Sequence, residues 1–156
     1  MHKGDLVADF TAHDQHGTPR SLSEFLAKGP VVLFFYPAAM TAGCTTESCH
    51  FRDLAAEFAE VGAQRIGISR DSVSTQAEFA SRNDFDYPLL SDPDGAIATR
   101  FGASRNRGPL LTKRKTYVIG TDSRVLDVIK SELRMSVHAD KALRALRASQ
   151  EGNAES

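Results

Sequence analysis

The stretch that decides the fold is VVLFFYPAAMTAGCTTESC, residues 31–49. It starts with a run of aliphatic and aromatic residues that lies between Gly29-Pro30 and Pro37. Such a short apolar run between chain breakers indicates a strand that is buried on both faces of a sheet. We therefore expect a central strand over residues 31–36, followed by a loop that leads into two closely spaced cysteines.

A helix and a second strand are predicted to follow this loop. Apolar residues recur at three- and four-residue spacing through CTTESCHFRDLAAEFAEV, residues 44–61, which is typical of a helix that buries one face. Residues 65–69, RIGIS, then read as a second short strand. A strand, a helix and a strand of these lengths predict a right-handed crossover between parallel strands.

The rest of the chain continues to alternate between helices and strands. The further predicted elements are a helix over about residues 72–83, an apolar strand segment at 88–90, a helix over about 94–101, strands at 116–119 and 125–129, and a final helix from about Val137 to Arg147. A polar turn cluster between the last two strands predicts an antiparallel hairpin. Together these elements predict an α/β fold with a mixed central sheet flanked by helices, and their order resembles the thioredoxin-like fold.

Length and composition predict one domain. A chain of 156 residues with 41% hydrophobic residues can bury one core, which we place in residues 1–148. The polar segment SQEGNAES, residues 149–156, predicts a loose C-terminal tail. With 19 Lys and Arg against 20 Asp and Glu, the charge favours neither a nucleic acid nor a membrane as partner. The N-terminus lacks the apolar core of a secretory signal, so we expect a cytoplasmic protein.

The two cysteines, Cys44 and Cys49, are the first candidates for chemistry. In a reducing compartment such a pair is more often catalytic, redox-active or metal-binding than structural. Cys44 lies where a helix is expected to begin, so its sulfur would face unpaired backbone N–H groups and the positive end of the helix dipole. That dipole stabilises the nucleophilic thiolate by roughly 0.3 to 2 kcal/mol. Thr41 supplies a hydroxyl that can donate and accept, and Gly43 leaves room for close approach to the backbone.

This stretch resembles the active site of the peroxiredoxin family. Pro37, Thr41 and Cys44 match the family's Pro-x-x-x-Thr-x-x-Cys motif, which follows a strand. Cys49, five positions after Cys44, is similar to the second cysteine of the Q-type subfamily, also called bacterioferritin-comigratory proteins. The likeness extends over about residues 4–147. The chain departs from many relatives in having Ala42 where they have proline, which leaves the loop less rigid in the unfolded ensemble.

The resemblance implies a thiol-dependent peroxidase. Cys44 would attack hydrogen peroxide or an organic hydroperoxide and become a sulfenic acid, and Cys49 would close an intramolecular disulfide with it. Thioredoxin or a similar dithiol donor would then reduce the disulfide. Thr41 would take part in catalysis, and Pro37 and Gly43 would line the substrate site.

The family also places an active-site arginine just before a late strand. Arg114, which precedes Lys115-Thr116-Tyr117-Val118-Ile119, is the candidate. Lys113 and Lys115 lie on either side of it, so the sequence leaves open which of the three is the active-site cation.

A disulfide between these cysteines requires a conformational change. Residues five apart in a helix have Cα atoms roughly 8.7 Å apart, whereas a disulfide tolerates about 7 Å at most. We therefore predict that about residues 41–52 unwind locally in each catalytic cycle.

Other functions fit the residues less well. His50 beside Cys49 could complete a metal site, but these spacings match no usual zinc pattern, and no complete nucleotide-binding motif is present, so we expect neither metal nor cofactor. A protein-disulfide oxidoreductase typically uses Cys-x-x-Cys, whereas four residues separate the cysteines here. A non-catalytic redox sensor could use the same pair as a switch. We expect a monomer, with a dimer as the alternative.

Overall fold

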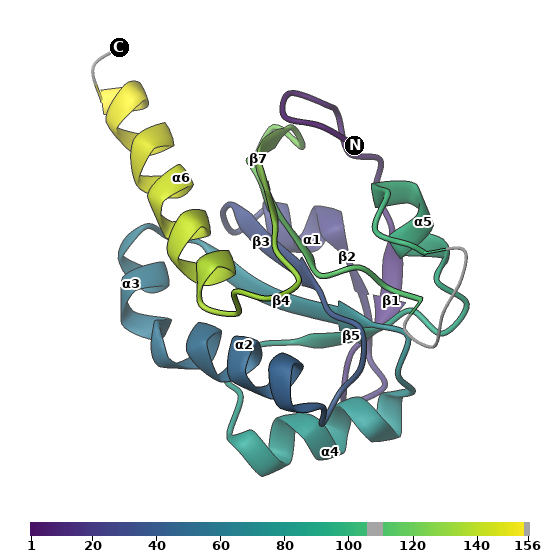
Figure 1. The fold of residues 1–156 in the computed structure, drawn as a ribbon. Helices are drawn as coiled ribbons and strands as arrows, with labels where there is room; N and C mark the ends of the chain where they lie inside the picture. The colour runs from purple at the N-terminus through teal and green to yellow at the C-terminus, as the bar shows by residue number, and fades with distance from the viewer. Residues whose placement is uncertain (106–110, 155–156) are drawn as a thin grey trace.

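A computed structural model describes residues 1–105 and 111–154, and in it helices cover both faces of one mixed sheet (Figure 1). The strands are β1 Thr11–His13, β2 Pro19–Ser21, β3 Val31–Phe35, β4 Gln64–Ser69, β5 Leu89–Ser91, β6 Lys115–Ile119 and β7 Val125–Lys130. The helices are α1 Leu22–Leu26, α2 Ala42–Asp53, α3 Ala55–Glu60, α4 Val73–Asn83, α5 Ala96–Phe101 and α6 Val137–Ala154.

The sheet has the strand order β2-β1-β5-β4-β3-β6-β7. Strands β3, β4 and β5 are parallel neighbours, which confirms the predicted crossover between residues 31–36 and 65–69. Strand β6 pairs antiparallel with both β3 and β7, which confirms the predicted hairpin. The mixed α/β architecture is therefore the predicted one.

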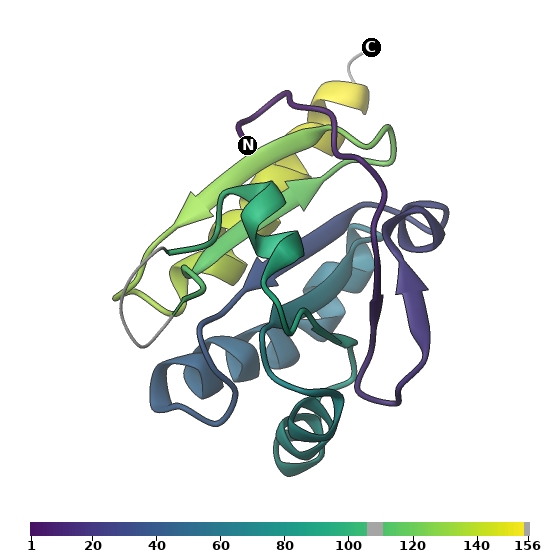
Figure 2. The same cartoon turned by 90° about the vertical axis from the view of Figure 1, so that its right-hand side faces the viewer.

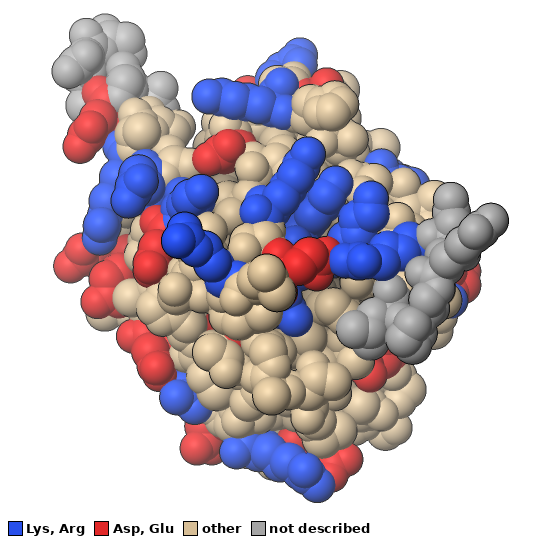
Figure 3. Space-filling model, in the orientation of Figure 1, with Lys and Arg blue, Asp and Glu red and all other residues tan. Residues whose placement is uncertain are grey.

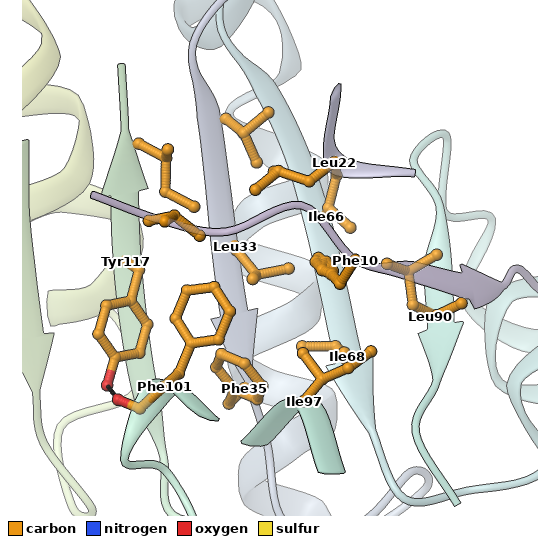
Figure 4. Packing of buried hydrophobic residues seen from close by; sticks show 14 of the residues in the cluster. Phe10, Leu22, Leu33, Phe35, Ile66, Ile68, Leu90, Ile97, Phe101 and Tyr117 are labelled. Carbon is orange, nitrogen blue, oxygen red and sulfur yellow. Dashed lines mark hydrogen bonds between the residues drawn. The ribbon is translucent and has the colours of Figure 1, made fainter. Parts of the chain in front are cut away.

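Strand β3 is buried along its whole length because a separate hydrophobic cluster packs on each face of the sheet. Val31, Leu33 and Phe35 belong to the cluster under α1 and α5, which is drawn in Figure 4. Val32 and Phe34 alternate with them and belong to the cluster under α2, α3, α4 and α6. Figure 2 shows the sheet between these two layers. Side chains of a strand alternate between faces, so an unbroken apolar run is what a strand between two cores requires.

The predicted helix over residues 44–61 is wrong in one respect, because the chain forms two helices that meet at Leu54. A continuous helix would bond the N–H of Ala55 to the carbonyl of Phe51. Here the guanidinium of Arg65 donates to that carbonyl at 2.9 Å. A side chain that takes a carbonyl out of the helical ladder is a recognised cause of a helix break.

The N-terminal thirty residues add elements that the sequence analysis did not predict. Strands β1 and β2 have three residues each, and their mixed polar composition gives little periodic signal. Helix α1 does have a local signal, because Ser21 and Glu24 form a capping box at its start.

The last helix extends beyond its predicted end. Helix α6 continues past Arg147 to Ala154, and so includes part of the segment whose composition predicts a loose tail. Residues 155–156 of that tail lie outside the described residues. In the part of the chain that the structure describes, no helix is both long and apolar enough to cross a membrane.

Candidate active site

The candidate site lies where β3 ends and α2 begins. The chain leaves the sheet at Tyr36 and turns through Met40, which has a positive φ of 64°. Helix α2 starts at Ala42, and its first backbone hydrogen bond runs from the N–H of Thr45 to the carbonyl of Thr41 at 2.9 Å. Cys44 therefore sits in the first helical turn, where backbone N–H groups precede the hydrogen-bonded ladder. Its side chain is buried, with a relative exposure of 1%.

The pairing of β6 with β3 explains how Arg114 reaches this turn. The two strands are antiparallel, and Phe35 at the end of β3 faces Lys115 at the start of β6. The residue before Lys115 therefore lies beside the loop that follows β3. Strand β7 runs antiparallel to β6, so the segment after Lys130 returns to the same edge of the sheet.

Arg114 joins the sulfur to a buried carboxyl group. Its Nη2 donates to the Sγ of Cys44 at 3.2 Å, and its Nη1 donates to the Oε1 of Glu47 at 2.9 Å. The side chains of Arg114 and Glu47 are only 6% and 0% exposed. Burial disfavours the charge on Arg114, but Glu47 and Cys44 outweigh it and raise the pKa of the guanidinium. The cation is therefore held in place over the thiol.

The neighbours of Arg114 do not occupy this position. Lys115 directs its Nζ to the carbonyl of Gly102 at 3.0 Å, and Lys113 is half-buried. Of the three candidate cations, Arg114 is the one that donates a hydrogen bond to Cys44 among the described residues.

Glu47 is fully buried, and Arg114 is the cation that its carboxyl group contacts. Burial raises the pKa of Glu47 to about 8, although Arg114 acts in the opposite direction. Its second oxygen, Oε2, has no hydrogen-bond partner among the described residues. The nearest ionisable group on that side is His138 of α6, whose Nε2 lies 3.6 Å from Oε2.

Asp71 supports the loop before Cys44. It follows β4, the parallel neighbour of β3, and its carboxylate accepts from the backbone N–H of Ala39 at 2.8 Å and from the hydroxyl of Ser69 at 2.6 Å. The amide of Gln76 in α4 donates to the same Ser69 hydroxyl at 2.9 Å. Loops at the carboxyl ends of parallel strands commonly form ligand sites, and this network fixes one of them.

Pro37, Thr41 and Gly43 lie in the segment between β3 and Cys44 and have different surroundings. The hydroxyl of Thr41 donates to the carbonyl of Ala38 at 2.8 Å, which commits its proton and leaves its lone pairs to accept. A Cβ on Gly43 would lie 3.4 Å from the Nη2 of Arg114 and 3.2 Å from Met135, so the backbone approaches both closely. Pro37 is half-buried and lies two residues after the end of β3.

Cys49 faces a different side of the same helix. It is half-buried and lies 3.7 Å from the Oδ1 of Asn83 in α4, and both cysteines are free thiols. Residues five apart in a helix point about 140° apart, since each residue turns the helix by about 100°. The two sulfurs are therefore separated by the helix itself.

Sequence reasoning did not identify Glu47, His138 or Met135. Helical spacing could have found Glu47, because a residue three positions after Cys44 lies on the same face of α2. His138 and Met135 follow β7, some ninety residues further along the chain, and no local pattern connects them with Cys44.

A basic surface lies beside the site. Burial lowers the pKa of Lys115, and the positive charges of the nearby Lys130 and Lys113 lower it further. Lys141 and Arg144 of α6 line a groove beside β7. Figure 3 shows Lys and Arg side chains gathered across the face that carries β7 and α6 in Figure 1.

Comparisons with known proteins all match this chain to one family of proteins. The profile of the AhpC/TSA family matches residues 3–128. The chloroplastic peroxiredoxin Q of Sedum lineare is 38% identical over 144 residues, which cover 92% of this chain and 77% of that protein. The crystal structure of peroxidoxin BcpB from Mycobacterium tuberculosis has a TM-score of 0.91 and 62% identity, over 95% of this chain and 97% of the other. The bacterioferritin comigratory protein of Xanthomonas campestris, studied for alkyl peroxide reduction, has a TM-score of 0.82 and 31% identity, over 90% and 91% of the two chains.

Proposed function

The chain belongs to the AhpC/TSA family and within it to the Q-type peroxiredoxins, which are thiol peroxidases, and from this premise we propose that Cys44 is the peroxidatic cysteine and Cys49 the resolving one. The observation that carries the assignment of Cys44 is its hydrogen bond from Arg114, at 3.2 Å in the first turn of α2. A buried guanidinium and a helix N-terminus both favour the thiolate over the thiol. The Sγ of Cys49 instead lies 3.7 Å from the Oδ1 of Asn83.

In the proposed reaction the Cys44 thiolate attacks the terminal oxygen of a hydroperoxide. The S–O bond forms as the O–O bond breaks, which oxidises the sulfur to a sulfenic acid and releases an alkoxide or hydroxide that takes up a proton. The fixed Nη2–H of Arg114 lies where the negative charge moves from sulfur to the leaving oxygen. The hydroxyl of Thr41 donates to the carbonyl of Ala38, so its oxygen can accept a hydrogen bond from the O–H of the peroxide.

Cys49 then attacks the sulfenic acid of Cys44, and water leaves as the disulfide forms. This step requires the first turns of α2 to unwind, because the cysteines lie on different sides of the helix. Thr45, Thr46 and Ser48 between them have low helix propensity, which lowers the cost of unwinding.

Hydrogen exchange tests this conformational step. Backbone amides of α2 should exchange markedly faster in the disulfide form than in the reduced form, because the helix cannot persist across the new bond. Mass spectrometry of peptides from both forms measures the difference, and β3 serves as an internal reference. Equal protection of α2 in the two forms would show that the disulfide forms without unwinding.

The function is tested by following peroxide loss with thioredoxin, its reductase and NADPH. Wild type should turn over many equivalents of peroxide, whereas Cys49→Ser should consume about one equivalent at a similar initial rate and then stop. The variant leaves the nucleophile intact and removes the thiol that makes the enzyme recyclable. Sustained turnover by Cys49→Ser with the same donor would contradict the resolving role.

The basic surface around Lys113, Lys115 and Lys130 supports a dithiol protein with an acidic face as the physiological reductant. Organic hydroperoxides join hydrogen peroxide as proposed substrates, since the similar Xanthomonas protein is described by its alkyl peroxide reduction activity.

We place the reaction in the cytoplasm and expect a monomer. Size-exclusion chromatography with light scattering in both redox states tests the monomer.

The two rival functions give different results in the same experiments. A protein-disulfide oxidoreductase would reduce insulin rapidly and show little peroxide turnover. A redox sensor would be oxidised once by peroxide, slowly and stoichiometrically, without sustained consumption of NADPH.

A further inference from the structure

The buried centre of this site holds two acids and one fixed cation. Cys44 and Glu47 both contact the guanidinium of Arg114, and all three side chains are almost fully excluded from water. If both acids lost their protons, the centre would carry two negative charges against one positive charge. Buried charges that are not balanced are costly, so one of two neighbouring acids tends to keep its proton.

The other groups that face Glu47 do little to stabilise a carboxylate. Glu132, from the segment between β7 and α6, adds a further negative charge nearby. His138, from the start of α6, has Arg114 and Lys141 as neighbouring cations and a pKa that burial, first of all, lowers. It is therefore neutral at neutral pH.

The hydrogen bonds of His138 leave it unable to serve the free oxygen of Glu47 well. Its Nε2 lies 2.8 Å from the carbonyl of Ser131, which can only accept, so this nitrogen carries a hydrogen. Its Nδ1 lies 2.7 Å from the hydroxyl of Thr116. Both ring nitrogens are thus engaged, and the Oε2 of Glu47 remains without a partner among the described residues. An unpaired buried oxygen favours the neutral form of an acid.

We propose that Glu47 is a neutral carboxylic acid while Cys44 is a thiolate, and that ionisation of Glu47 switches peroxide reduction off at alkaline pH. Glu47 is a positioning residue, because it acts on the reaction through Arg114. In the neutral form its Oε1 still accepts from Nη1 and orients the guanidinium, while the positive charge is left to the thiolate and the reacting oxygen. An ionised Glu47 competes for that charge and repels the thiolate. The inference rests on the proposed roles of Cys44 and Arg114.

The pH dependence of the reaction tests the proposal. In stopped-flow measurements of kcat/KM for hydrogen peroxide, wild type should lose activity above pH 8, by about tenfold per pH unit for a single ionisation. Glu47→Gln, which resembles the neutral acid in shape, should show no such fall and should exceed wild type at pH 9.5. A wild-type profile without the fall, or the same fall in Glu47→Gln, would overturn the proposal.

His50→Gln is the matched control. His50 in α2 contacts Asp140 in α6 at 2.8 Å, so this pair also links the two helices, but it does not contact Arg114. The variant should retain the alkaline fall of wild type. A general loosening of α2 against α6 would alter both variants, whereas the proposed effect is confined to Glu47→Gln.

Unfolding gives a second readout that needs no peroxide. The pKa of Glu47 is about 8 in the folded chain and near its ordinary value of 4.5 when unfolded. The neutral carboxyl group of Glu47 therefore makes a contribution to the free energy of unfolding that is fully present below pH 4.5 and is lost as the pH rises to about 8. The free energy of unfolding in urea should fall more over this range for wild type than for Glu47→Gln. If the free energy of unfolding changed equally with pH in wild type and Glu47→Gln, Glu47 would not be neutral, even with Cys44→Ser inactive. If Cys44→Ser were active, only the proposed function would be refuted.

Discussion

Replacing Cys44 by serine should reduce kcat/KM for hydrogen peroxide by at least about a thousandfold. A serine hydroxyl is not ionised at neutral pH, so the nucleophile is removed while the size and hydrogen bonding of the side chain are nearly kept. Arg114 and Glu47 would remain paired at 2.9 Å, so the fold should be retained. The measurement is stopped-flow peroxide consumption, accompanied by a thermal melt of each variant.

Cys49→Ser is the control for this experiment, because it removes a thiol from the same helix and leaves the Arg114 contact intact. It should keep the fast first turnover that Cys44→Ser lacks. If Cys44→Ser retained the wild-type rate, the peroxidatic sulfur would not be Cys44. A loss of the fast phase in Cys49→Ser alone would exchange the two proposed roles.

Replacing Arg114 by glutamine should lower kcat/KM for peroxide by roughly 10²- to 10³-fold, the usual effect of removing a fixed donor from a developing charge. The guanidinium bonds Cys44 and Glu47 at once, at 3.2 and 2.9 Å. A lysine at the same position has a compact charge on a flexible stem and cannot reproduce this planar, two-point geometry. Arg114→Lys should therefore recover only a small part of the loss.

The flanking lysines are the controls for Arg114, because the sequence alone leaves all three residues as candidates. Lys115→Gln and Lys113→Gln should each change kcat/KM for peroxide less than tenfold, since it is Arg114 that donates to the sulfur of Cys44. If Lys115→Gln lowered kcat/KM for peroxide as much as Arg114→Gln, the assignment of Arg114 as the catalytic cation would be wrong. The KM for the dithiol donor should be measured in parallel, because the lysines belong to the basic surface.

The parts of the fold that the sequence predicts are those with a strong local pattern. The buried run at β3 and the polar turn between β6 and β7 have such a pattern, and both elements form as expected. The break at Leu54 was not predictable from helical periodicity, because its cause is Arg65, a residue of the next strand. Tertiary contacts can override a periodic signal.

The site shows the same division. Cys44, Thr41 and Gly43 lie in one motif, and local spacing suffices to single them out as candidates. The roles of Glu47 and His138 depend on burial and on charged groups from distant parts of the chain, and no local sequence pattern contains this information. A buried Glu in the first turns of a helix reads from sequence as an ordinary exposed residue, because glutamate is usually at the surface.

The interruption of the helix at Leu54 limits how far the proposed unwinding of α2 has to extend. Helix α3 has its own anchor in Phe58, which is fully buried, and it shares no continuous ladder with α2. Phe51 stacks on Phe34 with ring centroids 4.1 Å apart and fastens the far end of α2 to the sheet. Unwinding of α2 can therefore end at the break and leave α3 with its own backbone bonds and its anchor Phe58. A chain with one unbroken helix would have to melt a longer segment to bring the same two sulfurs together.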